Sequence, residues 1–283
     1  MRNLVEKGII PAVNFHLWKA CNYKCKFCFG TFNDVKKNNL EYEEAKRTVQ
    51  NLAGFGFEKI TFSGGEPTLC KYLPKLLKIA KNAGMTTSIV TNGSMLNYDW
   101  LNENKDYLDW IAISIDSINI ETNIRSGRFN KNNSFTEEIY IELIQLIKEI
   151  GFKLKINTVV SNFNKNEDFN EFINWVKPER WKIFQALPIE VQNDKYKDDF
   201  MVNQFEFNNY LKRHKSSSYI KESNYDMKGS YIMVDPIGRF FENSKGIHKY
   251  SSKINSVGVE RALSEINYCF KKFINREGLY DWE

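Results

Sequence analysis

The sequence lacks the features of a secreted or membrane-spanning protein. No apolar run approaches the ~18 residues of a membrane-spanning helix, and the start, MRNLVEKGII, has no long apolar core of a signal peptide. Five cysteines are present in 283 residues, three of them too closely spaced to pair comfortably, so a disulfide framework is not expected. We therefore expect a cytoplasmic protein in a reducing compartment.

The composition is that of a folded domain with one core. A hydrophobic fraction of 42% is ordinary, and an α/β barrel uses a length of this order as a single unit. The net charge of +5 is a mild excess built mostly from lysines. It indicates a solvated surface, and direct nucleic-acid binding is not expected.

Short apolar strands alternate with helical patterns along the first two thirds of the chain. Strands are expected at 13–18, 59–63, 86–91, 111–115, 152–160 and 181–186, with helices at 41–54, 72–83, 98–107, 137–150 and 167–176. Six such alternations imply a parallel sheet with helices outside it. The fold class predicted for residues 1–187 is α/β, a partial (β/α)6 barrel of the TIM type.

The rhythm changes after Pro188. A helix is expected at 205–214, a hairpin at 231–234 and 239–242, and a further helix at 259–266. We interpret residues 188–283 as an extension that caps the barrel and its substrate site within the same structural unit.

Three cysteines mark the first candidate site. Cys21, Cys25 and Cys28 follow the first strand in CNYKCKFC, a Cys-x3-Cys-x2-Cys spacing with Phe27 before the last cysteine. Three thiolates on one loop suit three irons of a cubane cluster whose fourth iron stays open. A structural zinc site or plain buried thiols remain the alternatives, although zinc normally takes four ligands and Cys70 and Cys269 are isolated.

Polar turns follow the next strands, at the barrel end where active sites form. Ser63, Gly64, Gly65 and Glu66 follow the second strand; glycines let a backbone approach a ligand, and a carboxylate accepts from an amine. Asn92 and Ser114 end the third and fourth strands, with turn chemistry as the alternative.

Alternation along the fifth and sixth strands places cations inside the barrel. In KLKINTVV, Lys155 and Asn157 share the face opposite Leu154 and Ile156, and in RWKIFQ, Arg180 and Lys182 share a face. Crowded interior cations require an anion, and a triphosphate fits them. The alternative is that they reach solvent or pair with acids. Lys59 and Arg128 are further candidates for this site.

The histidines give weaker signals. Asn14 and His16 alternate on the first strand and are expected to face inward, His16 either as a ligand contact or as a core residue. His214 and His248 have polar sequence neighbours, and no catalytic role is expected for them.

Taken together, the motifs resemble those of the viperins, a family of radical S-adenosylmethionine enzymes in antiviral defence, and specifically their microbial members. The segments that carry the resemblance are NFH, CNYKCKFC, KITFSGGEP, SIVTNGS, IAISIDS, KINTVVSNFN, RWKIFQ, the region from FNNYLKRHK to ESNYDMKGSYIMVD, and the final YDW. They span almost the whole chain.

The resemblance implies roles for the candidate residues. Cys21, Cys25 and Cys28 would bind a [4Fe-4S] cluster, and S-adenosylmethionine would be held by a set comprising Phe27, Ser63, Gly64, Gly65, Glu66, Asn92 and Ser114. A nucleoside triphosphate, CTP, UTP or GTP, would be held by a set comprising Asn14, His16, Lys59, Lys155, Asn157, Arg180 and Lys182. Tyr231 would be catalytic or support the phosphates.

The implied reaction begins with reductive cleavage of S-adenosylmethionine. The 5′-deoxyadenosyl radical would take the ribose 4′ hydrogen, the 3′ hydroxyl would leave as water, and an electron donor would complete a 3′-deoxy-3′,4′-didehydro nucleotide. Such a product lacks a 3′ hydroxyl and would be expected to terminate viral RNA chains. The protein is expected to be a monomer. Membrane attachment is not expected, because the amphipathic helix of animal viperins is absent here.

Two other functions remain open at this stage. One is a radical enzyme that modifies RNA or a peptide, and the other is a non-catalytic metal-binding interaction module. The base preference also stays open, because Gly30 and the pair Asn133 and Ser134 depart from the animal viperins. Glu283 follows the tryptophan that ends the animal proteins, so the role of the tail stays open as well.

Overall fold

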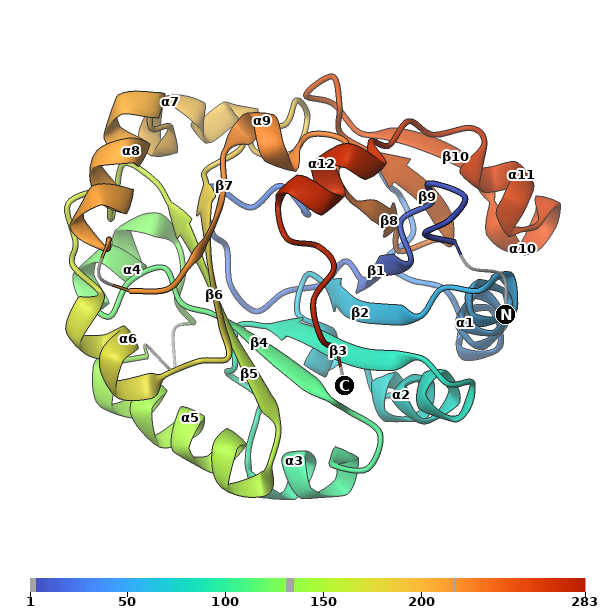
Figure 1. Ribbon diagram of the computed structural model, residues 1–283, viewed down its shortest axis with the longest axis horizontal. Coiled ribbons are helices and arrows are strands. Elements are labelled where there is room, and N and C mark those ends of the chain that lie inside the picture. Colours follow the sequence, from blue (N-terminus) through green and yellow to red (C-terminus); the bar gives the residue numbers. More distant parts are fainter. Residues whose placement is uncertain (1–3, 131–134, 216, 283) are drawn as a thin grey trace.

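A computed structural model describes residues 4–130, 135–215 and 217–282. Asn133, Ser134 and Glu283 lie outside the described residues. The strands form one ten-stranded sheet in the order β10-β9-β8-β1-β2-β3-β4-β5-β6-β7, so β10 and β7 are its two edges. Figure 1 shows the central strands curving around an interior, with helices on their outer side.

The six expected parallel strands are all present and adjacent in chain order. They are β1 (Ala12–Trp18), β2 (Lys59–Gly64), β3 (Thr86–Thr91), β4 (Trp110–Ser114), β5 (Lys153–Val160) and β6 (Arg180–Gln185). The helices between them are α1 (Tyr42–Phe55), α2 (Leu73–Asn82), α3 (Tyr98–Asn104), α4 (Ile120–Ser126), α5 (Glu137–Ile150) and α6 (Asn170–Val176), together with the 3-10 turn η1 (Pro67–Leu69). The predicted partial barrel is confirmed, and α4 and η1 were not predicted.

Local sequence explains the helix boundaries. Helix α5 begins after Thr136, whose side chain accepts from a backbone N–H of the first turn, and ends at Gly151 with φ 100°, as predicted. Helix α1 was predicted to end at Gly54, but it continues to Phe55 and ends at Gly56 with φ 114°. The later glycine adopts the left-handed conformation that ends a helix.

The C-terminal extension adds strands to both sides of the barrel. Strand β7 (Ile220–Glu222) pairs in parallel with β6, and β8 (Ile232–Val234) pairs in parallel with β1. The predicted hairpin is formed by β8 and β9 (Arg239–Glu242), which β10 (Lys249–Lys253) follows. The sequence predicted neither β7, β10 nor the attachment to β1.

The extension also carries short helices. They are η2 (Asp194–Tyr196), α7 (Lys197–Phe200), α8 (Gln204–Arg213), α9 (Asn224–Met227), α10 (Ile254–Val257), α11 (Val259–Leu263) and α12 (Phe270–Asn275). After α12 the chain runs across the concave side of the sheet to the C-terminus (Figure 1). This path takes the last residues into the barrel interior, where Tyr280 contacts side chains of β2 and β5.

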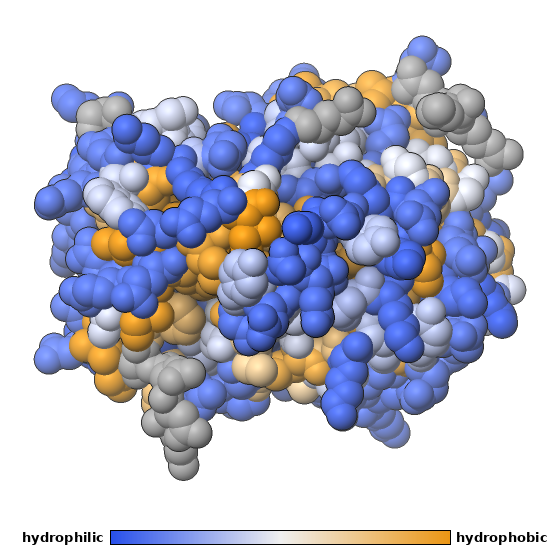
Figure 2. All heavy atoms as spheres, turned by 90° about the horizontal axis from the view of Figure 1, so that it is seen from below, coloured by the Kyte–Doolittle hydropathy of each residue, from blue (hydrophilic) through white to orange (hydrophobic). Residues whose placement is uncertain are grey.

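One main hydrophobic core lies between the sheet and its helices. Helix α2 contributes Leu73, Leu76, Leu77 and Ala80 to it. Its lysines lie on the other face, and polar side chains cover most of the surface seen in Figure 2. Within the described residues, no helix has the length and apolar character needed to cross a membrane.

Candidate active site

All the residues proposed from the sequence for chemistry line a single cavity of about 350 Å³. They are Asn14, His16, Cys21, Cys25, Phe27, Cys28, Lys59, Ser63, Gly64, Gly65, Glu66, Asn92, Ser114, Lys155, Asn157, Arg180, Lys182 and Tyr231. The three cysteines follow the carboxyl end of β1, whereas Lys59 and Arg180 begin β2 and β6. The cavity therefore runs along the barrel, with thiols towards one end and cations towards the other.

The three thiols share the cavity without forming a compact single-ion site. In the part of the chain that the structure describes, no three His, Cys, Asp or Glu side chains are placed to hold one metal ion. A zinc ion would draw its thiolates to ~2.3 Å from one centre, whereas each cysteine of a cubane cluster binds its own iron. Burial raises the pKa of Cys21 to about 11 and of Cys25 to about 12, so stable thiolates here require a bound cation. This arrangement fits an iron–sulfur cluster.

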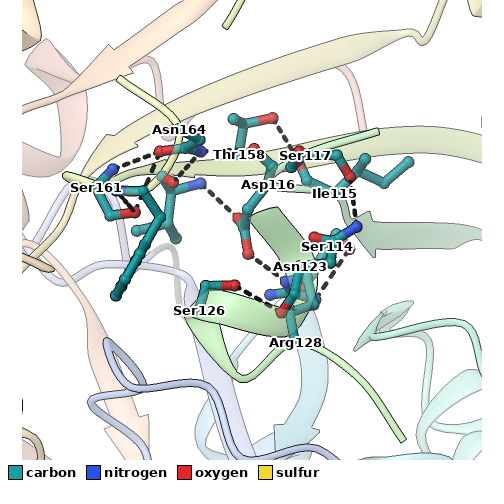
Figure 3. A network of polar contacts seen from close by, with 12 residues as sticks. Ser114, Ile115, Asp116, Ser117, Asn123, Ser126, Arg128, Thr158, Ser161 and Asn164 are labelled. Atoms are coloured by element: carbon teal, nitrogen blue, oxygen red, sulfur yellow. Dashed lines mark hydrogen bonds and ion pairs between the residues drawn. The ribbon is translucent and has the colours of Figure 1, made fainter. Parts of the chain in front are cut away.

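A buried ion pair adjoins the cysteine loop. Arg128 donates from Nε to Asp116 and from Nη1 to the Ser114 carbonyl at 3.1 Å, and Asp116 also accepts from the Val159 backbone at 2.7 Å (Figure 3). The guanidinium lies 5.9 Å from the Phe27 ring centroid. Its positive charge lowers the pKa of all three cysteines against the effect of burial. Arg128 therefore lies at the thiol end of the cavity. The sequence had suggested instead that it joins the interior lysines.

The two glycines after β2 are required by backbone packing. A Cβ at Gly64 would lie 2.3 Å from the Trp18 carbonyl oxygen, and one at Gly65 would lie 2.2 Å from that of Ala20. The Gly65 N–H donates to Trp18 at 2.5 Å and the Glu66 N–H to Ala20 at 2.8 Å. The sequence predicted that these glycines let a ligand approach the backbone. In the structure, the backbone at Trp18 and Ala20, leading into the cysteine loop, makes that close approach.

Glu66 is tied into the protein by its own hydrogen bonds. One carboxylate oxygen accepts from Thr68 N at 3.1 Å and from the Thr68 and Thr91 hydroxyls at 2.6 Å each. The other accepts from the Asn92 N–H at 2.8 Å. Burial raises the pKa of Glu66, with these donors acting against it. The second oxygen retains room for one more donor, such as an ammonium group.

The side chain of Asn92 stabilises a turn, the role that the sequence left open as the alternative to a ligand contact. Its side-chain oxygen accepts from the Ser94 N–H at 2.9 Å, and its amide donates to Asn22 of the cysteine loop at 2.9 Å. The residue still lines the cavity, as does Ser114 at the end of β4. The turn therefore fixes the position of the loop beside the thiols.

At the other end, Lys59 and Lys155 converge on the C-terminal segment. Both Nζ atoms donate to the hydroxyl of Tyr280 and lie 4.5 Å from its ring centroid, and the Arg180 guanidinium stacks on the same ring at 3.8 Å. Trp110 donates from its indole nitrogen to the Trp282 carbonyl at 2.8 Å, which fixes the segment. Tyr280 and Trp282 stand in the YDW motif but received no role from the sequence.

Burial and mutual repulsion weaken the basicity of these cations. The pKa of Lys59 falls to about 7, chiefly through burial, and that of Lys155 falls well below its ordinary value through burial and the charge of Lys59. Burial also lowers the pKa of Arg180. No carboxylate of the described residues forms an ion pair with any of the three. The group therefore has the electrostatics of an anion site.

Lys182 belongs to a different group. Its Nζ pairs with Glu222 and donates to the Tyr231 hydroxyl at 3.1 Å, and Tyr231 donates to Glu222 at 2.5 Å. Arg276, which also lines the cavity, lies 3.5 Å from the same carboxylate. Pairing with an acid, the alternative considered for the interior cations, thus holds for Lys182. The sequence missed Glu222 and Arg276, which lie in the extension outside any strand or helix that it predicted.

The polar surroundings that the sequence indicated for two histidines are not found in the structure. His214 is fully buried against Trp181 and Tyr210, and His248 packs between Phe241 and Phe32. The ring of His214 hydrogen-bonds to the protein backbone, at 2.8 Å from the Phe169 nitrogen and at 2.8 Å from the Tyr210 carbonyl oxygen. His16 faces the cavity as expected and also contacts Phe32 and Phe241, and burial followed by the influence of His248 lowers its pKa to about 3.

Several buried polar atoms of the cavity have no hydrogen-bond partner within the described protein. They are Nδ1 of His16, the Tyr23 and Ser63 hydroxyls, the side-chain oxygen of Asn157, Nε of Arg180 and the indole nitrogen of Trp282. Buried polar atoms are normally satisfied, so unpaired ones facing a cavity mark positions for ligand contacts.

Comparison with known proteins defines the class first. The sequence model described as "Radical SAM superfamily" matches residues 16–176. Among solved structures, that of anSMEcpe, described as holding AdoMet and a peptide, gives a TM-score of 0.69 at 15% identity, over 90% of this chain and 80% of that chain. Coproporphyrinogen III oxidase from Escherichia coli gives 0.54 at 15% identity, over 72% and 51%. These two structures share the fold.

Curated relatives are much more similar. The S-adenosylmethionine-dependent nucleotide dehydratase of Flammeovirga pacifica is 51% identical over 100% of both chains. A protein of the same name from Lacinutrix mariniflava is 52% identical over 99% of this chain and 60% of its own length, and one from Oncorhynchus mykiss is 37% identical over 96% and 80%. The chain therefore belongs to the S-adenosylmethionine-dependent nucleotide dehydratases, the viperin family of the radical SAM superfamily. This confirms the expected family and its cofactors, a [4Fe-4S] cluster and S-adenosylmethionine.

Proposed function

We propose that this protein is a radical S-adenosylmethionine nucleotide dehydratase whose substrate is a nucleoside triphosphate, CTP, UTP or GTP. The product would be the 3′-deoxy-3′,4′-didehydro nucleotide, a chain terminator for antiviral defence. The observation that carries the proposal is one cavity with three cysteines at one end and three cations at the other, two of them buried, that pair with no carboxylate of the described residues.

The thiol end provides the cofactor site. Cys21, Cys25 and Cys28 would hold the cluster, and Glu66 and the Ser63 hydroxyl would receive the amino group of S-adenosylmethionine. Arg128 lines the same cavity, and its positive charge, partly neutralised by Asp116, favours the thiolate forms of the cluster ligands. When bound, these cofactors supply the radical that takes the ribose 4′ hydrogen.

The cation end provides the substrate site. Lys59, Lys155 and Arg180 would bind phosphate oxygens, which replace the Tyr280 hydroxyl as the acceptor of the two lysines. The free oxygen of Asn157 and Nδ1 of His16 would contact the ribose or base. Binding phosphates at this end points the sugar toward the thiols, as the reaction requires.

The proposal also covers the electron donor, the location, the oligomeric state and the size of the substrate. A protein or small-molecule reductant would supply electrons, and the enzyme would act as a cytoplasmic monomer. A cavity of about 350 Å³ favours a small substrate over the alternatives of an RNA or a folded peptide.

The test is product analysis under anaerobic conditions. The protein is reconstituted with iron and sulfide and incubated with dithionite, S-adenosylmethionine and one of the four nucleoside triphosphates. We expect 5′-deoxyadenosine together with a nucleotide lighter by one water for the preferred base. Cleavage of S-adenosylmethionine without change in any nucleotide would reject the substrate assignment while keeping the cluster chemistry.

Matched cysteine variants provide the control. Cys28→Ala is expected to lose cluster absorbance and both products, whereas Cys269→Ser, which changes an exposed thiol, retains them. Equal iron content in both variants would contradict the assignment of the cluster ligands.

A further inference from the structure

Glu222, the last residue of β7, is a fully buried carboxylate that faces three cavity residues. Its Oε1 pairs with Lys182 and lies 3.5 Å from Arg276 Nη1, and its Oε2 accepts from the Tyr231 hydroxyl at 2.5 Å. Lys182, Tyr231 and Arg276 line the cavity, whereas Glu222 does not. The carboxylate therefore lies directly behind the groups that would meet a substrate.

The four side chains connect the β6–β7 side of the opening to the β8 side, and no strand pairing within the described residues joins these two sides. Lys182 lies on β6 and Glu222 on the edge strand β7, while Tyr231 directly precedes β8, which pairs with β1 on the other side of the opening. Arg276 follows α12. The contacts of Glu222 thus hold the open side of the barrel together at the cavity wall.

The hydrogen bonds also fix the direction of the Tyr231 hydroxyl. A phenol has one proton to donate and can accept at its oxygen. Tyr231 gives its proton to Glu222 and accepts one from Lys182 at 3.1 Å. Its oxygen therefore presents a lone pair, and not a proton, to any group that approaches from the cavity.

The cations around Glu222 differ in their electrostatics from the cations proposed to bind phosphate. With Lys182 and Arg276 facing a carboxylate, their positive charge is partly neutralised, whereas Lys59, Lys155 and Arg180 have no such partner among the described residues. Burial lowers the pKa of Lys182 to about 8, against which the charge of Glu222 acts. The acid thus keeps Lys182 protonated and anchored beside Tyr231.

We propose that Glu222 is a positioning residue of the nucleotide site, which holds Lys182 and Tyr231 so that the Tyr231 oxygen accepts a hydrogen bond from a ribose hydroxyl. The proposal rests on the proposed nucleotide dehydratase function. Because Glu222 acts through its neighbours, its loss should disturb the geometry of the reacting ribose while leaving the phosphate cations intact.

The test compares Glu222→Gln with Asp235→Asn in the reconstituted enzyme. Asp235 is another fully buried carboxylate paired with an arginine, Arg239 at 2.7 Å, and does not line the cavity. For Glu222→Gln we expect kcat to fall on the order of 100-fold, because ribose placement is lost. Triphosphate affinity, measured by calorimetry, should stay equal or increase, because a negative charge has left the site. Asp235→Asn should lower the melting temperature without changing either constant.

Other outcomes overturn the proposal. Wild-type kcat in Glu222→Gln would do so, and so would a parallel loss of kcat and affinity, which indicates general damage to the fold. If Glu222→Gln does not fold, Tyr231→Phe replaces it, with the same expected loss of kcat at unchanged affinity, and wild-type turnover in that variant also overturns the proposal. A wild-type enzyme that dehydrates no triphosphate rejects the proposed function itself, and the role of Glu222 with it.

Discussion

Lys155 and Lys182 lie on neighbouring strands and line the same cavity, yet they serve different groups. Lys182 pairs with the carboxylate of Glu222, whereas Lys155 donates to the Tyr280 hydroxyl and pairs with no acid of the described residues. A single strand pair thus presents one neutralised cation and one uncompensated cation to the interior. Of these two lysines, Lys155 is therefore the one whose charge is available to an anion.

The uncompensated lysine should carry triphosphate binding. Lys155→Ala is expected to weaken the affinity for the substrate triphosphate at least ~10-fold, about 1.4 kcal/mol, because a buried charge-assisted contact is lost. Lys153→Ala is the matched control, since Lys153 lies two residues away on β5 and does not line the cavity. Calorimetry on the reconstituted enzyme measures both, and equal affinities in the two variants would refute the phosphate assignment.

Triphosphate affinity and apoprotein stability should respond to pH in opposite directions. The pKa of Lys59 is about 7, so folded Lys59 loses its proton well below pH 10.5, the value for the unfolded chain. Between these values the unfolded chain holds more protons, and the free energy of unfolding of the apoprotein rises with pH. Phosphate binding needs the charged lysine, so affinity falls above pH 7, by up to about tenfold per pH unit for each proton taken up.

Chemical denaturation and calorimetry from pH 6.5 to about pH 8 check these slopes, because at higher pH the raised pKa values of thiols such as Cys21 and Cys25 make apoprotein stability fall. Saturating triphosphate should flatten the rise in stability, because the bound phosphates keep Lys59 protonated. A stability that falls over this range, or an affinity that rises, would mean that the Lys59 pKa is not depressed.

Two glycines make a contrasting pair. Gly65→Ala is expected to destabilise the protein by several kcal/mol, since its Cβ would overlap the Ala20 carbonyl at 2.2 Å in the cysteine loop. Gly54→Ala, within α1 and with no atom within 4 Å of the added Cβ, should stabilise it by about 0.5–1 kcal/mol. Thermal unfolding and iron content measure both, and a Gly65→Ala protein that unfolds and binds iron as the wild type does would contradict the packing argument.

Val191 shows the opposite case, a β-branched residue where glycine is preferred. Its φ is 69°, in the left-handed region, and its side chain is largely exposed. Val191→Gly should therefore stabilise the protein by about 1 kcal/mol through relief of backbone strain. Val257→Gly, at a similarly exposed helical position in α10, should destabilise it by ~0.5–1 kcal/mol. Thermal melts of the two variants that shift in the same direction would disprove the strain argument.

Local patterns predicted the barrel and much of the cavity. The alternation of side chains in β5 predicted that Lys155 and Asn157 face the interior, and both line the cavity. This prediction needs no tertiary information, because the alternation follows from the backbone of a strand alone. Glu222 was missed because its three-residue strand has no pattern of its own and exists only by pairing with β6. The surroundings of His248 were misjudged because its ring packs on Phe241 across a turn and on Phe32 from a distant segment, contacts that its immediate sequence neighbours do not show.

The attachment of the extension to both sides of the barrel also governs how the protein is made. Strand β1 emerges from the ribosome first, yet its partner β8 follows more than two hundred residues later. Until then, β1 and β6 each present an unpaired edge, to which other chains readily add. Such long-range pairing folds slowly, so the nascent barrel passes through an aggregation-prone interval that ends only when its last third is synthesised.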